Sequence, residues 1–476
     1  MSQSPVRPPI VQSLPAGFSI TKAFGKLAAL PGRLWLDSAS QPKDLPASDF
    51  ADLGRYSFLT ADPVDRLVAS VDDANPWPQL NHWCRQLPAD QDPSLPPFQG
   101  GIAGIIGYEA GAWLENVGVP TDNDLPTPAM SLGWYDWTIA IDHHSGKALL
   151  ICRGDSPSTG PDESKAKRRA DQISSILGDC ITAPQQEEQR HAEVAEVNSN
   201  FTSDEFQAAV AEVVRRIRDG DSFQVNLAQR LVRKANQAAA ELYQRLRVSN
   251  PAPFGGFYDG SLGSAFGDEE FAVLSSSPEG FLTLRDRVVQ TRPIKGTIRR
   301  GDDKASDADL ARQLSASEKD RAENVMIVDL MRNDLSRVCE DDSVQVLKLC
   351  EIERYQFVQH LVSVVEGRLR SECSVVDLLQ ACFPGGSVTG APKIEAMRTI
   401  AELEPNPRGP YCGSMGYISS ADVADFNILI RTITAAGGHW QIPVGGGITA
   451  RSKPAAEEAE TWAKAEGMLR AISETK

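Results

Sequence analysis

The chain has 476 residues and a formal net charge of −16, because 64 acidic residues outnumber 48 lysines and arginines. Hydrophobic residues make up 41% and charged residues 24%, which is the balance of a soluble globular protein of two or three domains. An acidic surface repels nucleic-acid phosphates and anionic lipids, so the composition argues against both as partners.

The distribution of apolar residues and cysteines predicts a cytoplasmic protein. No apolar run approaches the ~20 residues that a membrane-spanning helix requires. The Pro-rich N-terminal sequence lacks the continuous apolar stretch of a signal peptide. Eight cysteines are scattered without a C-x-x-C pair or a histidine at zinc spacing, which is typical of reduced thiols.

Residues 1–180 alternate short apolar runs with turn residues and form the first predicted region. Within it, Trp134–Asp142 and Lys147–Cys152 predict a β-hairpin, and residues 160–180 carry a helical period. The polar stretch 181–200 lacks a strong apolar stripe, so we expect a surface linker there.

Residues 201–476 form the second predicted region, which begins with an amphipathic helix. The segment Phe201–Asp219 opens with the capping sequence FTSDEF, keeps one face apolar and ends at Gly220. Hairpin-like strands such as FAVLSSS, FLTLRD and RVVQTRP then lie between helices, without a βαβ rhythm or an internal repeat. This order favours an α+β fold over a doubly wound sheet.

Two predicted helices each carry a pair of carboxylates on one face. Asp320 and Glu323 stand at i, i+3 in the first helix, and Glu457 and Glu460 have the same spacing in the second, which Pro454 opens. Two such pairs could hold Mg²⁺, which prefers oxygen ligands and keeps several waters. The spacing alone fits solvated surface glutamates equally well.

Two glycine-rich segments, CFPGGSVTGAPKIEAM and VGGGITARS, place exposed backbone amides where they could bind an anionic group. Tight turns alone would explain the same glycines. Neither segment has the spacing of a phosphate-binding or dinucleotide-binding loop, so nucleotide binding has little support.

Two single side chains are candidates for chemistry. Lys295 lies between an apolar run and a glycine, where a partly buried amine with a lowered pKa would be a nucleophile, whereas an ordinary lysine there is a solvated turn residue. His360 is flanked by apolar residues and is either a packed core histidine or an acid–base group.

Together these segments resemble the chorismate-utilising enzyme family, which includes anthranilate synthase large subunits, aminodeoxychorismate synthases component I, and isochorismate and salicylate synthases. The matching blocks, in chain order, are FQVNLAQR (223–230), SSSPEGFL (275–282), TRPIKGT (291–297), KDRAENVMIVDLMRND (319–334), VQHLVS (358–363), FPGGSVTGAPKIEAM (383–397), GPYCGSMGY (409–417), DFNILIRT (425–432) and GGGITA (445–450). The N-terminal blocks GRYSFLTADP and GGIAGIIGYEAGAWLE resemble the amine-adding branches. The resemblance implies two mostly antiparallel β-sheets packed with helices in a layered sandwich, with a chorismate site in the cleft of the catalytic region 201–476.

Within the family, two positions favour the aminodeoxychorismate branch. Gln224 stands where isochorismate and salicylate synthases usually carry a water-activating lysine, and Lys295 stands where anthranilate synthases typically carry alanine. The segment NPAPFGGFY (250–258) also departs from the NPSPY-type motif with which anthranilate synthases bind tryptophan. One departure from the family is Gly280, which replaces a common arginine beside Glu279.

The resemblance also implies roles for individual residues. Lys295 would attack the chorismate ring, Glu279 would protonate the departing hydroxyl, and His360 would orient or protonate near the ring. Magnesium would be held by Glu323 and Glu460, with Asp320 and Glu457 acting largely through water. The expected substrate contacts are Gln224, Thr297, Ser387, Tyr411, Arg431, Gly446, Gly447 and Lys464.

The resemblance implies a partner as well. The chain lacks the glycine-rich nucleophile elbow and the His-x-Glu pair of a glutaminase, so ammonia would come from a separate glutamine amidotransferase subunit. The alternatives are anthranilate synthesis and a non-catalytic, chorismate-binding regulatory subunit.

Overall fold

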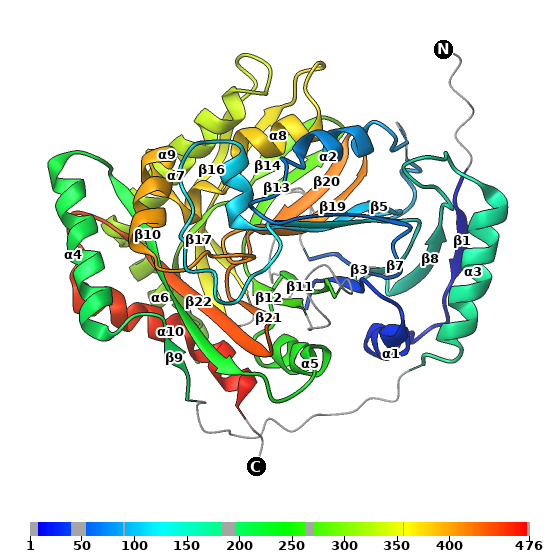
Figure 1. Ribbon diagram of the computed structural model, residues 1–476, viewed down its shortest axis with the longest axis horizontal. Coiled ribbons are helices and arrows are strands. Elements are labelled where there is room, and N and C mark those ends of the chain that lie inside the picture. The colour runs from blue at the N-terminus through cyan, green and yellow to red at the C-terminus, as the bar shows by residue number, and fades with distance from the viewer. Residues whose placement is uncertain are drawn as a thin grey trace.

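The computed structural model describes residues 8–39, 54–88, 91–181, 196–261, 271–355 and 357–473. These residues form a twelve-stranded and a ten-stranded sheet, and every strand pairing in both is antiparallel. Helices cover the outer faces of the two sheets (Figure 1). The predicted α+β class is therefore confirmed.

The first sheet contains strands from both ends of the chain. In spatial order they are β1 (Ile10–Ser13), β8 (Lys147–Cys152), β7 (Trp137–Asp142), β3 (Tyr56–Thr60), β2 (Leu34–Asp37), β11 (Phe254–Asp259), β12 (Ala272–Ser277), β21 (Thr432–Ala436), β22 (His439–Ile448), β10 (Gln224–Lys234) and β18 (Gly390–Ala391), with β9 (Asn198–Ser199) also paired to β10. The long β10–β22 pair lies along one side of the molecule, with the C-terminal helix beside it (Figure 1).

The second sheet also contains strands from both parts of the chain. Its strands are β15 (Ile294–Arg299), β17 (Val358–Arg368), β14 (Val288–Thr291), β13 (Gly280–Arg285), β20 (Val423–Asn427), β19 (Ser414–Ser420), β5 (Gly101–Ile106), β6 (Met130–Tyr135) and β4 (Asp65–Ala69), with β16 (Gln345–Arg354) also paired to β17. Because residues 1–180 and 201–476 both contribute strands to both sheets, the two sequence regions share one core.

The helices end where the local sequence dictates. They are α1 (Ile20–Lys26), α2 (Trp77–Cys84), α3 (Glu163–Leu177), α4 (Ser203–Asp219), α5 (Ala239–Ser249), α6 (Lys304–Ala316), α7 (Glu318–Ser336), α8 (Val375–Cys382), α9 (Lys393–Leu403) and α10 (Pro454–Ile472), with the 3₁₀ turns η1 (Leu27–Ala29), η2 (Tyr108–Trp113) and η3 (Gly386–Val388). In α4, Thr202 and Glu205 form the predicted capping box, and Gly220 ends the helix at φ 97°.

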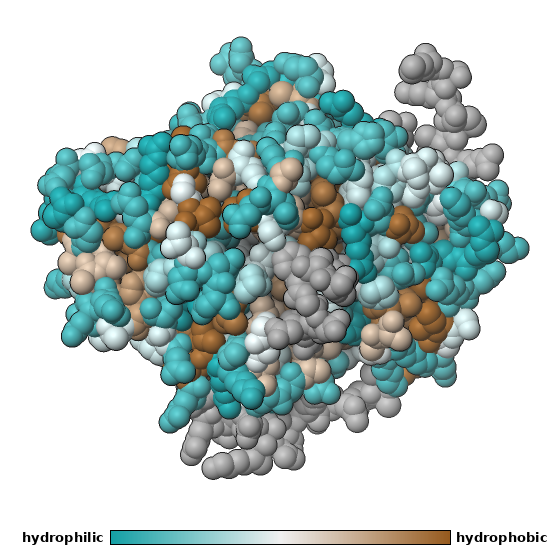
Figure 2. Space-filling view, in the orientation of Figure 1, coloured by the Kyte–Doolittle hydropathy of each residue, from teal (hydrophilic) through white to brown (hydrophobic). Residues whose placement is uncertain are grey.

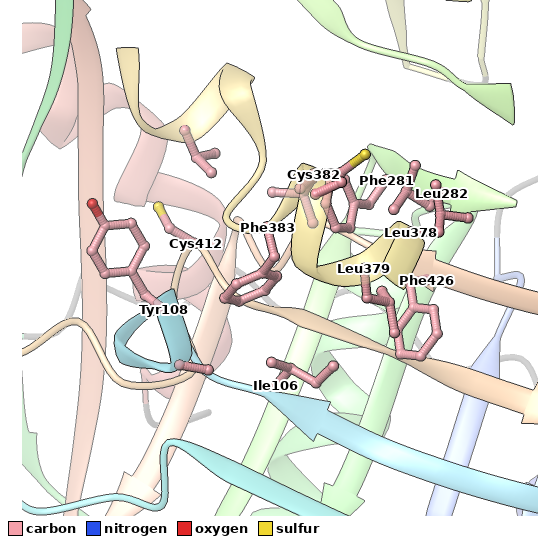
Figure 3. Packing of buried hydrophobic residues seen from close by; sticks show 14 of the residues in the cluster. Ile106, Tyr108, Phe281, Leu282, Leu378, Leu379, Cys382, Phe383, Cys412 and Phe426 are labelled. Atoms are coloured by element: carbon pink, nitrogen blue, oxygen red, sulfur yellow. The ribbon is translucent and has the colours of Figure 1, made fainter. Parts of the chain in front are cut away.

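The core is divided into layers by the two sheets. One apolar cluster lies between the sheets and includes Phe58, Tyr258 and Tyr417, from β3, β11 and β19. A second cluster packs α1, α3, α5 and α10 against the first sheet, and a third packs α2, α7 and α8 against the second. Figure 3 shows part of the third cluster, which includes Phe383, directly after α8, and Phe281 of β13, whose ring centroids are 6.3 Å apart. The layered sandwich implied by the resemblance is present.

One sequence expectation differs from the structure, and another lies mostly outside the described residues. The expected strand Trp134–Asp142 is wrong in extent, because the chain leaves the second sheet after Tyr135 and enters the first sheet at Trp137. Asp136 lies at this crossing, where Arg169 of α3 binds its carboxylate at 3.0 Å. Most of the expected linker, residues 182–195, lies outside the described residues, and Asn198–Ser199 forms β9.

The surface agrees with the acidic composition. The face in Figure 2 is mostly hydrophilic, with small and separate hydrophobic areas. Among the helices that the structure describes, none is both long and apolar enough to cross a membrane.

Candidate active site

A cavity of about 720 Å³ lies between β15, β17, α7, α10 and the loops that connect the two sheets. Most of the residues predicted from the sequence line it: Glu279, Lys295, Thr297, Asp320, Glu323, His360, Ser387, Tyr411, Arg431, Gly447, Glu460 and Lys464. Both polar and apolar groups face the cavity, and its size suits a small-molecule ligand.

The chain crosses from one sheet to the other at this cavity. Glu279 follows β12 of the first sheet and precedes β13 of the second, and Arg431 lies between β20 and β21 at the reverse crossing. The backbone N–H of Ile428 donates to the carbonyl of Glu279 at 3.0 Å, so the two crossings are tied together. Residues far apart in sequence are thereby held on one wall of the cavity.

Lys295 and Glu279 form the central pair of the site. Lys295 projects from β15, and its Nζ donates to the backbone carbonyl of Ser387 at 3.2 Å. Burial lowers the pKa of Lys295, although Glu323 and Glu279 oppose this effect. Burial raises the pKa of Glu279 to about 7, against hydrogen bonding by Ser387 and the charge of Lys295. The pair thus favours a neutral amine beside a protonated acid more than exposed groups would.

His360 is a neutral base in this environment. It lies on β17, is 1% exposed, and its Nδ1 is 2.9 Å from Oγ1 of Thr297. Burial lowers the pKa of His360 to about 3, and the positive charge of Arg431 acts in the same direction. The side chain can therefore orient a ligand by hydrogen bonding, but it carries no charge near neutral pH.

Arg431 and Tyr411 offer groups for an anionic ligand. Arg431 lines the cavity at a positive φ of 51°, and no carboxylate among the described residues forms an ion pair with it. Burial lowers its pKa, which indicates a cation whose charge lacks a partner. Tyr411 is 4% exposed. A substrate carboxylate at Arg431 would supply the missing charge.

The four predicted metal ligands come from α7 and α10, as the sequence predicts. Oε1 of Glu323 is buried without a hydrogen-bond partner, and the nearest cation is Nζ of Lys319 at 3.9 Å. Glu460 is bound instead by Lys464 at 2.9 Å, and Ser317 donates to Asp320 at 2.5 Å.

Whether these acidic side chains could hold a metal ion depends on how many protein ligands the ion needs. No group of three or more histidine, cysteine or acidic side chains is gathered closely enough to hold a metal in the part of the chain that the structure describes. Mg²⁺, however, needs only one or two carboxylates and fills its other positions with water and substrate. The unpartnered oxygen of Glu323 and the carboxylate of Glu460, which lines the same cavity, fit that requirement.

Three predicted residues lie at the edge of the cavity and do not line it. Gln224 is fully buried, and both atoms of its amide lack hydrogen-bond partners. Its amide carbon lies 3.0 Å from the place of a Cβ on Gly447, so a larger residue there would displace the amide of Gln224. A Cβ on Gly446 would lie 3.7 Å from both Glu457 and Glu460. Gln224, Gly446 and Glu457 therefore do not face the cavity as the sequence predicted.

Comparison with known proteins identifies the family of the chain. The family model for chorismate binding enzymes matches residues 33–470. The chain belongs to the chorismate binding enzyme family. It is 40% identical over 373 residues to aminodeoxychorismate synthase component 1 of Klebsiella aerogenes (78% of this chain and 77% of that one) and 38% identical over 388 residues to anthranilate synthase component 1 of Streptomyces coelicolor (80% and 74%).

Solved structures agree with this assignment. Anthranilate synthase component I from Streptococcus pneumoniae matches with a TM-score of 0.75 and 31% identity, over 90% of this chain and 94% of that one. The menaquinone-specific isochorismate synthase from Escherichia coli matches with a TM-score of 0.71 at 21% identity, over 99% and 96%, and so supports the fold alone. The fold of a chorismate binding enzyme is therefore confirmed.

Sequence reasoning missed several polar residues that line the cavity of this chorismate binding enzyme, among them Lys319 and Asn226. Lys319 lines the cavity, where Glu323, Glu457 and Glu460 raise its pKa against the effect of burial. Asn226 lines it too, and its Oδ1 is buried without a partner. Both lie inside blocks that match the family, KDRAEN and FQVNLAQR, so the blocks themselves were the signal.

Proposed function

We propose that the chain is component 1 of an aminodeoxychorismate synthase, which converts chorismate and ammonia into 4-amino-4-deoxychorismate. The observation that carries the proposal is the pairing of Lys295, whose pKa is lowered, with Glu279, whose pKa is raised to about 7, in one cavity. A nucleophilic amine beside a general acid is the pair that a two-step substitution needs. The similarity to aminodeoxychorismate synthases supports it.

In the first step the neutral amine of Lys295 forms a C–N bond to the ring. The ring double bonds shift, the C–O bond of the ring hydroxyl breaks, and Glu279 gives its proton so that water leaves. In the second step ammonia forms a C–N bond at the carbon that lost the hydroxyl. The bond to Lys295 then breaks and the lysine leaves as a free amine. The new ammonium group returns one proton to Glu279, so the enzyme is restored and the sum is exchange of a hydroxyl for an amine with release of water.

The remaining residues bind and orient the substrate. Arg431 would bind a carboxylate through its fork of N–H donors, with Tyr411, Ser387, Lys464 and the amide of Gly447 as further contacts. Thr297 fixes the imidazole of His360, which orients the ring. Gln224 lacks the basic group needed to activate water, which favours ammonia as the nucleophile.

Glu323 and Glu460 would hold Mg²⁺, with Asp320 and Glu457 acting through water. When bound, the ion would supply positive charge to the ring carboxylate and stabilise negative charge that develops in the ring. In the structure Lys464 pairs with Glu460. A cation bound at Glu460 would take over this pairing, and Lys464 could then contact the substrate.

Ammonia would come from a separate glutamine amidotransferase subunit, and the name "component 1" of the relatives indicates a second component in those enzymes. All eight cysteines are free thiols in the structure, which supports the cytoplasm as the compartment. We expect glutamine to support turnover only when the second subunit is added, whereas ammonium salts support it with this chain alone.

A product assay tests the proposed reaction. The chain is incubated with chorismate, Mg²⁺ and ammonium, with and without a lyase that removes pyruvate from aminodeoxychorismate. We expect para-aminobenzoate only when the lyase is present. Fluorescent anthranilate without lyase would instead support the second candidate, anthranilate synthesis, which the 38% identity to a Streptomyces anthranilate synthase favours. No consumption of chorismate would support a regulatory subunit.

The dependence of kcat on pH follows from the Lys295–Glu279 pair. The reactive form carries one proton, held by Glu279, while the amine is neutral. Loss of the first proton from the pair therefore activates it and loss of the second inactivates it, so kcat rises and then falls with pH. Since burial raises the pKa of Glu279 to about 7, we expect one limb centred near pH 7. This limb should be absent from the residual activity of Glu279→Gln; a limb that stays would contradict the role of Glu279.

A further inference from the structure

Two chain segments form a wall between the active-site cavity and a smaller cavity of about 120 Å³. In the segment that joins β12 to β13, Glu279 faces the active site, and Gly280, the first residue of β13, borders the smaller cavity. In the segment after α5, Asn250 faces the active site, and Phe254, the first residue of β11, borders the smaller cavity. The hydroxyl of Ser276 donates to the carbonyl of Asn250 and joins the two segments.

The closest contact across this wall is between Gly280 and the ring of Phe254. A Cβ added to Gly280 would lie 2.8 Å from Cζ and 3.1 Å from Cε1 of Phe254. Distances under 3.0 Å do not occur for real Cβ atoms, so the ring occupies the space that a side chain at position 280 would need. The ring is thus packed directly against the residue that follows Glu279.

The backbone around this contact is fixed on both sides. Asn427 pairs with Gly280 in the sheet, and its Nδ2 donates to the carbonyl of Phe254 at 2.8 Å. The carbonyl of Glu279 accepts from Ile428 at 3.0 Å, and the hydroxyl of Ser277 accepts from the N–H of Glu279 at 3.2 Å. With the backbone tied, the ring of Phe254 is the element that closes the wall beside Glu279.

We infer that Phe254 is a positioning residue for the acid Glu279. Its ring fills the space beside Gly280 and holds the segment between β12 and β13 in place. It thereby keeps water of the smaller cavity away from the carboxyl group of Glu279. This inference rests on the proposed role of Glu279. The residue does not touch substrate, because it borders the other cavity.

The charged side chains beside the smaller cavity are paired, unlike some of those that face the active site. Charged or titratable side chains from several elements share the active-site cavity with Glu279. They are Lys295 of β15, His360 of β17, Tyr411 and Arg431 of the connecting loops, Lys319, Asp320 and Glu323 of α7, and Glu460, Lys464, Glu466 and Arg470 of α10. On the side of the smaller cavity, Asp37, Arg285 and Arg292 are ion-paired with Arg247, Asp425 and Glu353. Opening the wall would therefore admit water without adding an unpaired charge.

The test is the pH profile of kcat for Phe254→Ala in the full chain, with ammonium as the nitrogen source. Because water stabilises a carboxylate, we expect the limb near pH 7 to move down by about 1 pH unit. We expect kcat to fall by about tenfold, while KM for chorismate changes by less than about twofold. Phe254→Leu, which refills most of the space, should return the limb to within about 0.3 pH unit of wild type.

Two further variants separate positioning from a general loss of stability. Phe58→Ala removes a ring from the same small cavity, where Phe58 packs on Phe98 and Tyr417 and not on Gly280. It should lower the melting temperature but leave the limb in place. Gly280→Ala should lower kcat by itself, and its effect should shrink by at least about threefold when combined with Phe254→Ala, because the smaller side chain makes room.

The outcomes are distinct. Equal shifts in Phe58→Ala and Phe254→Ala, or no shift in Phe254→Ala, would overturn the inference while leaving the proposed function intact. If Glu279→Gln keeps the limb near pH 7, the proposed role of Glu279 fails, and the inference fails with it.

Discussion

Replacing Lys295 with alanine is expected to lower the formation of aminodeoxychorismate by about 10³-fold or more, because the variant loses the nucleophile and keeps the acid and the binding groups. Ammonia could then enter the vacated space and attack the carbon that the lysine normally attacks. We therefore expect a small amount of product of the anthranilate series from Lys295→Ala. Liquid chromatography of the products with saturating ammonium, with and without lyase, measures both effects.

Two variants control this experiment. Lys295→Arg keeps a cation but cannot form the adduct, so it should be as inactive as Lys295→Ala. Lys167→Ala removes an exposed lysine of α3 and should behave as wild type. Full activity in Lys295→Arg would mean that position 295 serves only as a pocket cation.

Glu323→Gln and Glu460→Gln are each expected to reduce turnover by at least about 100-fold and to weaken Mg²⁺ binding with the fold intact. The physical reason is the loss of a charged oxygen from a site that has few. Oε1 of Glu323 is buried without a partner, so a cation is the ligand best able to compensate it. Titration calorimetry with Mg²⁺ measures binding directly, and thermal unfolding checks the fold.

The matched control is Glu318→Gln, an exposed glutamate in the first turn of the same helix. It should leave Mg²⁺ affinity and turnover unchanged. Unchanged Mg²⁺ affinity in both Glu323→Gln and Glu460→Gln would exclude the two-carboxylate site, and unfolding of either variant would mean that its carboxylate is structural.

Local sequence signals predicted the bounds of two helices well. The capping box at Thr202 and the glycine at 220 mark the ends of α4, and Pro454 marks the start of α10. These signals act over three or four residues and so can be read from the sequence. The strand at Trp134 was extended too far because its apolar pattern continues through Asp136, where a long-range ion pair accompanies the change of sheet.

The electrostatics of the site could not be predicted from the sequence alone. The raised pKa of Glu279 and the lowered pKa of His360 both come from burial, which depends on strands from distant parts of the chain. The contact of Gly280 with Phe254 joins residues of two different sheets and has no sequence spacing that would reveal it. The residue types were recognisable, whereas their protonation states required the assembled cavity.

The central claim is that Lys295 becomes covalently attached to the substrate. Mass spectrometry of the wild-type chain, mixed with chorismate and Mg²⁺ in the absence of ammonia and then quenched and digested, tests it most directly. We predict a peptide carrying Lys295 that is heavier by the mass of chorismate minus one water, absent from Lys295→Ala and lost when ammonium is added before quenching. An unmodified Lys295 peptide under conditions where ammonium supports full turnover would contradict the covalent mechanism.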